Sequence, residues 1–458
     1  MSVNIEELVQ GQKQFFQTGI TLPIKFRKEQ LKKLYFAVKK YEQEIANALN
    51  KDLGKSGYES FMCETGMVLA EIGYMIKHVK KFAKEKRVYT PLAQFASRSY
   101  KKPSPYGNTL IMSPWNYPLL LTLDPLADAI AAGNTAIIKP SAYSPATTDI
   151  IEKIITECFD GNYVSVVKGG REENASLLKQ KFDFIFFTGS QGVGKEVLRH
   201  TTENLTPVVL ELGGKSPCIV DDSAKIKLAA KRIVFGKFLN CGQTCVAPDY
   251  ILCDEKIKDQ LIAEVISQIK LQYGENPLHN KYYGKIVNQK HFERLKGLIN
   301  QDKVVFGGTS NDRMQICPTV LKDVTWEDDV MKDEIFGPIL PILTYRSIND
   351  VVELLYNKPK PLALYIFSQN KSNIKLITER CQFGGGCVND TIIHLASSEL
   401  GFGGVGESGM GAYHGKIGFD AFSHTKSIVD KKTWIDLPMR YQPYKSKLFS
   451  KLLHLFLK

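Results

Sequence analysis

The sequence predicts an α/β protein with two lobes of parallel sheet that share a cleft. From residue 108 to residue 212, short runs of β-branched and aromatic residues alternate with helical segments, and a second alternating series runs from about residue 219 to residue 425. Such alternation is typical of parallel sheets that helices cover on both faces. The chain of 458 residues is long enough to bury more than one core.

The elements follow in order along the chain. Residues 5–86 are predicted to be helical, because apolar side chains recur three or four positions apart. Three prolines and a polar–aromatic run interrupt this pattern over 87–106, which predicts an extended excursion that leaves the body of the fold and returns. The first alternating series predicts strands over 109–112, 135–139, 163–167, 183–187 and 208–212, with helices over 118–131, 145–158, 172–180 and 192–203.

Composition excludes several classes of protein. Hydrophobic residues make up 43% of the chain and charged residues 24%, which is the mix of a globular protein and not of a disordered or collagen-like chain. The nine cysteines follow no ligand spacing, so we expect reduced thiols and no metal site. Residues 1–10 contain no apolar block, and no apolar run approaches the ~18 residues of a spanning helix, so we expect a cytoplasmic protein.

The basic charge is concentrated at the C-terminus. The net charge is +12, and residues 431–458 hold seven Lys and Arg side chains against one acidic residue. Over 446–458, Lys447, Lys451, His454 and Lys458 share one helical face and Leu and Phe side chains the other, which predicts a basic amphipathic tail. This tail can contact a membrane surface, cap the pocket of its own chain or cover a dimer seam. No base-reading module accompanies it, so nucleic acid is not an expected partner.

Two residues have the chemistry of a nucleophile and its base. Cys245 lies between small and polar residues close to Gly242, which suits an open thiol, although a small buried hydrophobe is the alternative. Glu211 ends an apolar run that reads as a strand and precedes a glycine turn. A carboxylate at the carboxyl end of such a strand suits general-base work when it is desolvated, and the alternative is a surface glutamate.

Two further segments suit anion binding. Asn116 lies between two prolines just after a predicted strand, so its amide can donate to an oxyanion, or it can be an ordinary turn residue. The segment containing Gly189, Ser190 and Gly194 follows a strand and opens a helix, where backbone N–H groups can approach a phosphate. Glycine turns of this kind are common, so the segment alone is weak evidence.

Together these segments resemble the NAD(P)-dependent aldehyde dehydrogenase superfamily over nearly the whole chain. Segments 210–217 and 242–248 are similar to the glutamate and cysteine signatures of the family, and 334–338 is similar to its cofactor-clamping motif. The C-terminal glycine motif is matched at 401–404 and 408–411. The residues around Cys245 and the run at 413–416 look most like the class 3 branch, which includes fatty, medium-chain and aromatic aldehyde dehydrogenases and bacterial relatives.

The resemblance implies two Rossmann-like lobes and a small β element. The dinucleotide-binding domain would comprise 1–86 and 107–210, and the catalytic domain 211–424. The excursion at 87–106 and residues 425–445 would form an oligomerisation element, which implies a homodimer, with the basic tail at 446–458.

The resemblance also implies a role for each site residue. Cys245 would attack an aldehyde to give a thiohemiacetal, Asn116 and the Cys245 N–H would hold the oxyanion, and Glu211 would activate water to hydrolyse the thioester. Cofactor contacts are implied for Lys139, Gly189, Ser190, Gly194, Glu334 and Phe336. Medium- or long-chain aliphatic or aromatic aldehydes are the expected substrates. A catalytically silent cofactor binder and a coenzyme A-acylating relative are the competing interpretations.

Two departures from the family pattern concern the cofactor. Gln191 stands where the family usually has threonine, and Ala142 stands where the class 3 branch commonly has glutamate, three residues after Lys139. A glutamate there would accept from a ribose 2′-OH and repel a 2′-phosphate. Because Ala142 lacks that carboxylate, we expect the enzyme to accept NADP as well as NAD.

Overall fold

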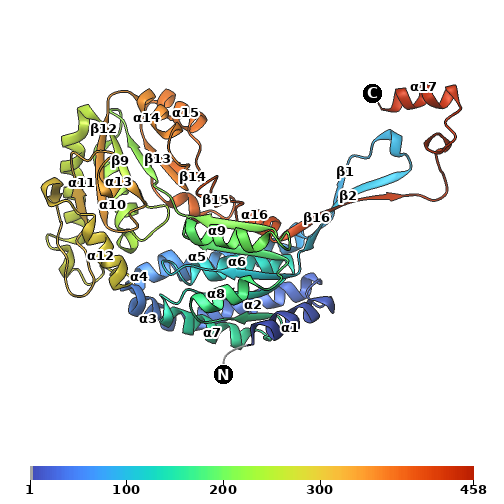
Figure 1. The fold of residues 1–458 in the computed structure, drawn as a ribbon, viewed down its shortest axis with the longest axis horizontal. Helices are drawn as coiled ribbons and strands as arrows, with labels where there is room; N and C mark the ends of the chain where they lie inside the picture. Colours follow the sequence, from blue (N-terminus) through green and yellow to red (C-terminus); the bar gives the residue numbers. More distant parts are fainter. Residues whose placement is uncertain (1–3, 458) are drawn as a thin grey trace.

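Two α/β lobes lie against each other in the computed structural model, and a thin arm extends from them (Figure 1). The structure describes residues 4–457, so Lys458 and the start of the chain at Met1 lie outside the described residues. The predicted α/β class is confirmed. Strands and helices of the first alternating series begin and end within two residues of their predicted bounds.

The first lobe contains a six-stranded sheet with strand order β15–β7–β6–β3–β4–β5. Its strands are β3 (Asn108–Met112), β4 (Thr135–Lys139), β5 (Val164–Val166), β6 (Phe184–Gly189), β7 (Val208–Leu212) and β15 (Gly409–Met410). All of them run parallel except β15, which pairs antiparallel with β7 so that Gly409 lies opposite Glu211. A late segment of the chain therefore completes the sheet at the strand that carries Glu211.

Helices cover this sheet on both faces, as its strongly apolar strands require. They are α1 (Ile5–Gln17), α2 (Ile24–Lys40), α3 (Glu42–Leu53), α4 (Gly57–Ser60), α5 (Gly66–Phe82), α6 (Leu120–Ala132), α7 (Pro145–Cys158), α8 (Arg171–Leu178), α9 (Gln191–Thr201) and α16 (Gly415–Ala421). All thirteen residues of α6 are buried, because α2, α5 and α16 pack around it. Its sequence is apolar on every face except for Asp124, Asp128 and Thr122.

The second lobe contains a seven-stranded sheet with strand order β10–β11–β12–β9–β8–β13–β14. The strands are β8 (Pro217–Val220), β9 (Tyr250–Asp254), β10 (Val304–Phe306), β11 (Thr319–Leu321), β12 (Ile339–Tyr345), β13 (Ala363–Phe367) and β14 (Gly385–Val388). Only the edge strand β10 is antiparallel to its neighbour. The helices are α10 (Ile226–Phe238), α11 (Lys258–Tyr273), α12 (Gln289–Gly297), α13 (Asp329–Lys332), α14 (Ile348–Tyr356) and α15 (Lys371–Arg380).

The arm is a three-stranded antiparallel sheet of β1 (Lys86–Val88), β2 (Ser97–Pro105) and β16 (Ser423–Lys431). It joins the two excursions that the sequence analysis placed together, with Ser423 opposite Pro105 and Lys431 opposite Ser97. The tail helix α17 (Lys447–Phe456) contacts a 3₁₀ turn at 92–94 at the far end of the arm (Figure 1). The tail therefore lies far from the lobes of its own chain and does not cap its own pocket.

Within residues 4–457, no helix is both long enough and apolar enough to cross a membrane.

Candidate active site

A sharply turned loop presents Cys245 between the two lobes. After α10, the residues Asn240, Cys241 and Gly242 take left-handed φ values of 51°, 53° and 73°. A Cβ atom at Gly242 would come within 2.3 Å of the Gly337 carbonyl oxygen, so only glycine fits there. The strained turn is held by hydrogen bonds, because the Asn240 amide side chain donates to the carbonyl oxygens of Asn116 and Gln243 at 2.8 and 3.1 Å.

Two cavities of different character meet at Cys245. A cavity of about 220 Å³ contains Cys245 together with Asn116, Glu211 and Glu334. A second cavity, of about 230 Å³, has an almost entirely apolar lining and also contains Cys245. Its lining includes Met62, Met67, Leu120, Phe235, Leu239, Ile392, Ile393, Leu395, Phe402 and Tyr413. The thiol is therefore accessible both from a polar compartment and from an apolar one.

Glu211 ends β7 as a buried carboxyl without a partner. Its side chain is 2% exposed, and neither carboxyl oxygen has a hydrogen-bond partner among the described residues. Burial raises the pKa of Glu211 well above its ordinary value, because the desolvated site disfavours the carboxylate anion. A carboxyl in this state, in the cavity that contains Cys245, can act as a general base once a partner or water stabilises its anion.

The Cys245 thiol is also neutral at rest. Burial raises the pKa of this thiol, and the carboxyl groups of Glu334 and Glu211 raise it further. Cys241, four residues earlier, is buried in the core of the second lobe. Cys245 is half-buried and faces the cavities, as a nucleophile must, but an added positive charge or a base is needed to ionise it.

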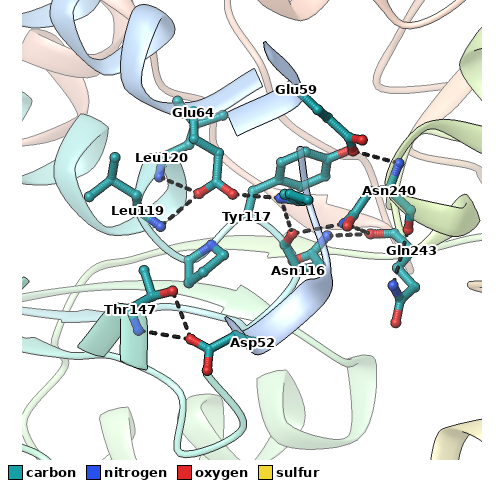
Figure 2. A network of polar contacts seen from close by, with 12 residues as sticks. Asp52, Glu59, Glu64, Asn116, Tyr117, Leu119, Leu120, Thr147, Asn240 and Gln243 are labelled. Atoms are coloured by element: carbon teal, nitrogen blue, oxygen red, sulfur yellow. Dashed lines mark hydrogen bonds and ion pairs between the residues drawn. The ribbon is translucent and has the colours of Figure 1, made fainter. Parts of the chain in front are cut away.

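Asn116 is held from both sides, as Figure 2 shows. Its side-chain amide donates to the Gln243 carbonyl at 3.1 Å and lies on the wall of the cavity that contains Cys245. Its own carbonyl accepts from Lys55 Nζ at 2.8 Å and from the Asn240 side chain. The proposed oxyanion donor and the nucleophile loop are thus tied directly to each other.

A buried ion pair supports this loop, and the sequence analysis missed it. Lys55 Nζ lies 2.5 Å from Glu64 Oε1, and both side chains are 0% exposed. The other Glu64 oxygen accepts from the N–H groups of Leu119 and Leu120 at the start of α6 (Figure 2). Lys55 and Glu64 lie in a stretch with many lysines and glutamates, so their burial could not be recognised from the residue pattern. The only sequence feature near Lys55 was the glycine at position 54, which ends α3 with a φ of 70°.

The cofactor-side residues Glu334, Phe336, Gly189 and Ser190 line the polar cavity with Cys245. Burial and the Asp249 carboxylate raise the pKa of Glu334 to about 8, and its buried Oε1 has no partner among the described residues. From this compartment the cleft continues into a polar cavity of about 470 Å³ that shares Ser190, Gly213 and Glu334. A buried carboxyl oxygen without a partner, at the place where two cavities join, is suited to accept hydrogen bonds from the hydroxyl groups of a nucleotide ribose.

The structure adds three residues to this compartment. The ring of Trp115 meets Phe336 edge to face at 5.3 Å, and Arg294 and His291 reach the same cavity from α12. Arg294 Nη2 donates to the Ile335 carbonyl at 2.6 Å. No motif distinguished Arg294 or His291 in the sequence.

Two predicted cofactor residues lie outside these cavities. Gly194 packs α9 on the sheet, because a Cβ atom there would come within 2.7 Å of the Leu212 side chain. Lys139 ends β4, and its ammonium donates to the carbonyl oxygens of Gly169 and Pro140 at 2.7 and 3.0 Å. Burial lowers the pKa of Lys139 to about 8, and the carboxylate of Glu173 opposes this.

A model of the aldehyde dehydrogenase family matches residues 2–428 of the chain. The protein therefore belongs to the aldehyde dehydrogenase family, and it is an oxidoreductase that oxidises aldehydes. Its relatives include the 4,4'-diaponeurosporen-aldehyde dehydrogenase of Staphylococcus aureus, which is 50% identical and aligns over 97% of each chain. The "aldehyde dehydrogenase, dimeric NADP-preferring" of Canis lupus familiaris is 42% identical over 97% of this chain and 99% of the relative.

A solved structure described as the substrate-bound state of Staphylococcus aureus AldH is 49% identical over the full length of both chains, with a TM-score of 0.97. Family 3 member A2 of Rattus norvegicus is 43% identical over 93% of this chain and 88% of the relative. The resemblance to the class 3 branch is thus confirmed, because relatives named for family 3 align over nearly the whole chain.

Substitution of Lys55 by methionine should destabilise the protein, because the Glu64 carboxyl would remain buried without its cation. We expect a loss of about 3–5 kcal/mol, the usual cost of breaking a buried pair, measured as a lower urea midpoint. Lys40→Met is the matched control, because Lys40 pairs with Glu157 at a similar distance on the surface. That exposed pair should contribute about 0–1 kcal/mol. Equal midpoints for the two variants would contradict the supporting role of Lys55.

The raised pKa of Cys245 predicts slow alkylation of the cofactor-free enzyme. Only the thiolate reacts with iodoacetamide, so the rate should still rise above about pH 9.5, where an ordinary thiol of pKa about 8.5 is already ionised. Mass spectrometry of the Cys245 peptide follows the reaction. Cys245→Ala shows the background from Cys387, the other half-buried cysteine. A rate that levels off near pH 8.5 would mean that burial does not control this thiol.

Proposed function

We propose that the protein oxidises apolar aldehydes to carboxylic acids with NAD(P)⁺, with Cys245 as nucleophile and Glu211 as general base. The single observation that carries this proposal is the position of Cys245 on the wall between a polar cavity with Glu211 and an apolar cavity. A thiol in this position can attack a carbonyl group whose hydrocarbon chain lies in the apolar cavity. A base and an oxyanion donor then lie on the polar side.

The reaction begins when Cys245 loses its proton and its sulfur attacks the aldehyde carbon to form a thiohemiacetal. The Asn116 amide and the Cys245 backbone N–H stabilise the oxyanion in a site with little water. When bound, the nicotinamide supplies the hydride acceptor. Oxidation must come before hydrolysis, because an aldehyde has no leaving group until its hydride has departed. The ionised carboxylate of Glu211 then takes a proton from water, and the oxygen of that water attacks the thioester carbon. The acid is released as the Cys245 thiolate leaves, and the proton on Glu211 returns to that thiolate to restore the thiol.

The cofactor would be held along the cavity that continues from Cys245. Glu334, whose Oε1 is unpartnered, would accept from the ribose of the nicotinamide half, and Phe336 would form a wall for its ring. Gly189, Ser190, Gly194 and Lys139 would serve the diphosphate and adenosine side. Because Ala142 has no carboxylate to repel a 2′-phosphate, NADP is accepted as well as NAD. The dog relative, which is named as NADP-preferring, is in line with this proposal.

The apolar cavity supports a medium- or long-chain or an aromatic aldehyde as substrate. Its lining includes Met and Leu side chains and the rings of Tyr117, Phe235, Phe402 and Tyr413. Burial of apolar surface contributes about 25 cal/mol per Å², so each further methylene of a substrate that fits adds about 0.8 kcal/mol of binding. The Staphylococcus aureus relative is itself named for an aldehyde, 4,4'-diaponeurosporen-aldehyde.

The arm supports a homodimer, and the tail supports contact with a membrane surface. β1 and β16 are the edges of the arm, and unpaired edges of this kind can accept a strand from a second copy. In α17, Leu448, Leu453 and Leu455 are exposed, next to the basic Lys447 and Lys451. We propose that the enzyme is cytoplasmic and associates peripherally with anionic membrane surfaces.

Turnover tests the proposed function directly. Hexanal, benzaldehyde and a C16 aldehyde, each with NAD and with NADP, should all give absorbance at 340 nm, with the lowest KM for the C16 aldehyde. Cys245→Ala should abolish the signal, and the carboxylic acid should be the product. Glu211→Gln should give a single burst of NAD(P)H and then stall as the thioester. Turnover with NAD alone would contradict the inference from Ala142, and no turnover on any aldehyde by folded protein would contradict the function.

Deletion of 446–458 tests the tail. The truncated enzyme should lose activity on the C16 aldehyde presented in anionic vesicles but keep its activity on hexanal, because only the long aldehyde resides in the membrane. Cosedimentation with the same vesicles should fall in parallel. Lys447→Glu with Lys451→Glu is the matched variant that keeps the apolar face. An equal loss on both substrates would contradict a role in substrate supply.

A further inference from the structure

The two side chains proposed to contact the nicotinamide half of the cofactor lie on one short loop, 333–338, which we call the cofactor loop. It connects α13 with β12 and belongs to neither a helix nor a sheet. Glu334 and Phe336 of this loop line the polar cavity that contains Cys245. Phe336 takes a left-handed φ of 50°, a conformation that a residue with a side chain keeps only when its surroundings fix it. The loop therefore needs contacts from outside to hold its shape.

A partly buried ion pair supplies several of these contacts. Lys215 Nζ donates to Asp249 Oδ2 at 2.6 Å, and the two side chains are 17% and 4% exposed. It also donates to the Asp333 carbonyl at 2.8 Å and to the Val330 carbonyl at 2.9 Å. Hydrogen bonds from a charged donor are stronger than those between neutral groups. The ammonium group therefore holds the start of the cofactor loop firmly.

Two more charged contacts continue this support on the far side of Glu334. The other Asp249 oxygen, Oδ1, accepts from the Ile335 N–H at 3.0 Å, and Arg294 Nη2 donates to the Ile335 carbonyl at 2.6 Å. The three consecutive peptide groups that join residues 333–336 are thus each held by a charged side chain. The backbone around both cofactor-facing side chains is therefore fixed by groups outside the loop.

The ion pair is itself fixed to the sheet of the second lobe. Lys215 lies two residues before β8 and Asp249 one residue before β9, and these neighbouring strands pair with Pro217 opposite Tyr250. The Asp249 N–H donates to the Ser216 carbonyl at 2.8 Å. Groups attached to regular elements are placed more precisely than groups on loops. The position of the cofactor loop is therefore set by the sheet through this pair.

We propose that Lys215 and Asp249 are positioning residues for the cofactor, which hold Glu334 and Phe336 in place before NAD(P) binds. The inference rests on the proposed function. A loop that is fixed in advance lowers the entropic cost of binding. Lys215 also lines the polar cavity of about 470 Å³, where an ammonium group can bind a phosphate directly. Its three N–H donors are already used, so Lys215 acts through the loop and not by contact with the diphosphate.

Binding of NADH without turnover tests the proposal. Lys215→Met removes the ammonium and keeps the length of the side chain, so the dissociation constant of NADH should rise about tenfold, measured by NADH fluorescence. The KM for NAD should rise in parallel. The KM for hexanal should not change, because no residue of the described segment 330–336 lines the apolar cavity. A loss of stability alone would not separate the two KM values.

Lys303→Met is the matched control. Lys303 forms a partly buried pair of the same length, 2.6 Å, with Asp328 in the same lobe, just outside the cofactor loop. The affinity of this variant for NADH should equal that of the wild type, because the peptide groups at 333–336 keep all their charged partners.

Asp249→Asn separates the two roles that Lys215 could have, and it replaces Lys215→Met if that variant does not fold. The amide keeps an oxygen for the Ile335 N–H but no longer pairs with the ammonium. Weaker NADH binding is expected from a positioning residue, whereas tighter binding would mean that the freed ammonium contacts the diphosphate and would overturn the proposal. Unchanged NADH binding by either folded variant, or an equal rise of both KM values, would overturn it as well. Wild-type protein that binds NADH but turns over no aldehyde would instead contradict the proposed function.

Discussion

The buried pair of Lys55 and Glu64 is the contact on which the geometry of the site depends. Glu64 fixes the first backbone N–H groups of α6, and Lys55 holds the carbonyl of Asn116, which also receives the side chain of Asn240. The start of α6, the proposed oxyanion donor Asn116 and the strained turn before Cys245 are therefore all held, directly or through one partner, by the Lys55 ammonium group. Two fully buried charges are tolerated only when the geometry is good and the remaining hydrogen bonds are made. The helical segment at the N-terminus thus supports a site whose side chains come from β7 and from loops of both lobes.

Burial, more than charge, sets the chemistry of the site. Cys245, Glu211 and Glu334 all have raised pKa values for the same first reason, which is that their surroundings do not solvate an anion. A site in which burial favours the neutral thiol and carboxyl forms admits an apolar aldehyde at little cost, whereas a preformed thiolate and carboxylate would each require water or a cation. The same desolvation strengthens the hydrogen bonds that receive the oxyanion. A positive charge or a base brought into the site is therefore needed to ionise the thiol.

Much of this arrangement was predictable from the sequence, for a physical reason. The bounds of the strands followed from short apolar runs. Because parallel strands bring their carboxyl ends to one edge of the sheet, Glu211 at the end of one strand and Asn116 after another were expected to lie at the same edge. The loop of Cys245 comes from the other lobe, and its place at this edge followed only from the family resemblance. Lys55, Glu64 and Arg294 could not be found in this way, because a buried charged residue in a stretch rich in charged residues has the same sequence pattern as a solvated one until its neighbours are known. Gly194, for which a cofactor contact stays a prediction, also lies so close to the Leu212 side chain that a Cβ atom there would come within 2.7 Å of it, so this glycine allows the close approach of helix and strand.

The glycines of the C-terminal segment 409–418 are explained by their contacts with the first lobe. Gly409 pairs opposite Glu211 in β15, and a Cβ atom there would come within 2.2 Å of the Leu210 carbonyl oxygen. A few residues later, Gly415 donates to Glu71, and Gly418 makes room for Asp128. One short segment therefore closes over the strand of the general base and over the buried acids Glu71 and Asp128. If the segment 409–418 only completed the sheet, it would need glycine in β15 and nowhere else. Glycine is also required beyond the motif, where Gly415 and Gly418 of α16 lie close to other groups, and Gly418 leaves room for the buried Asp128 carboxyl.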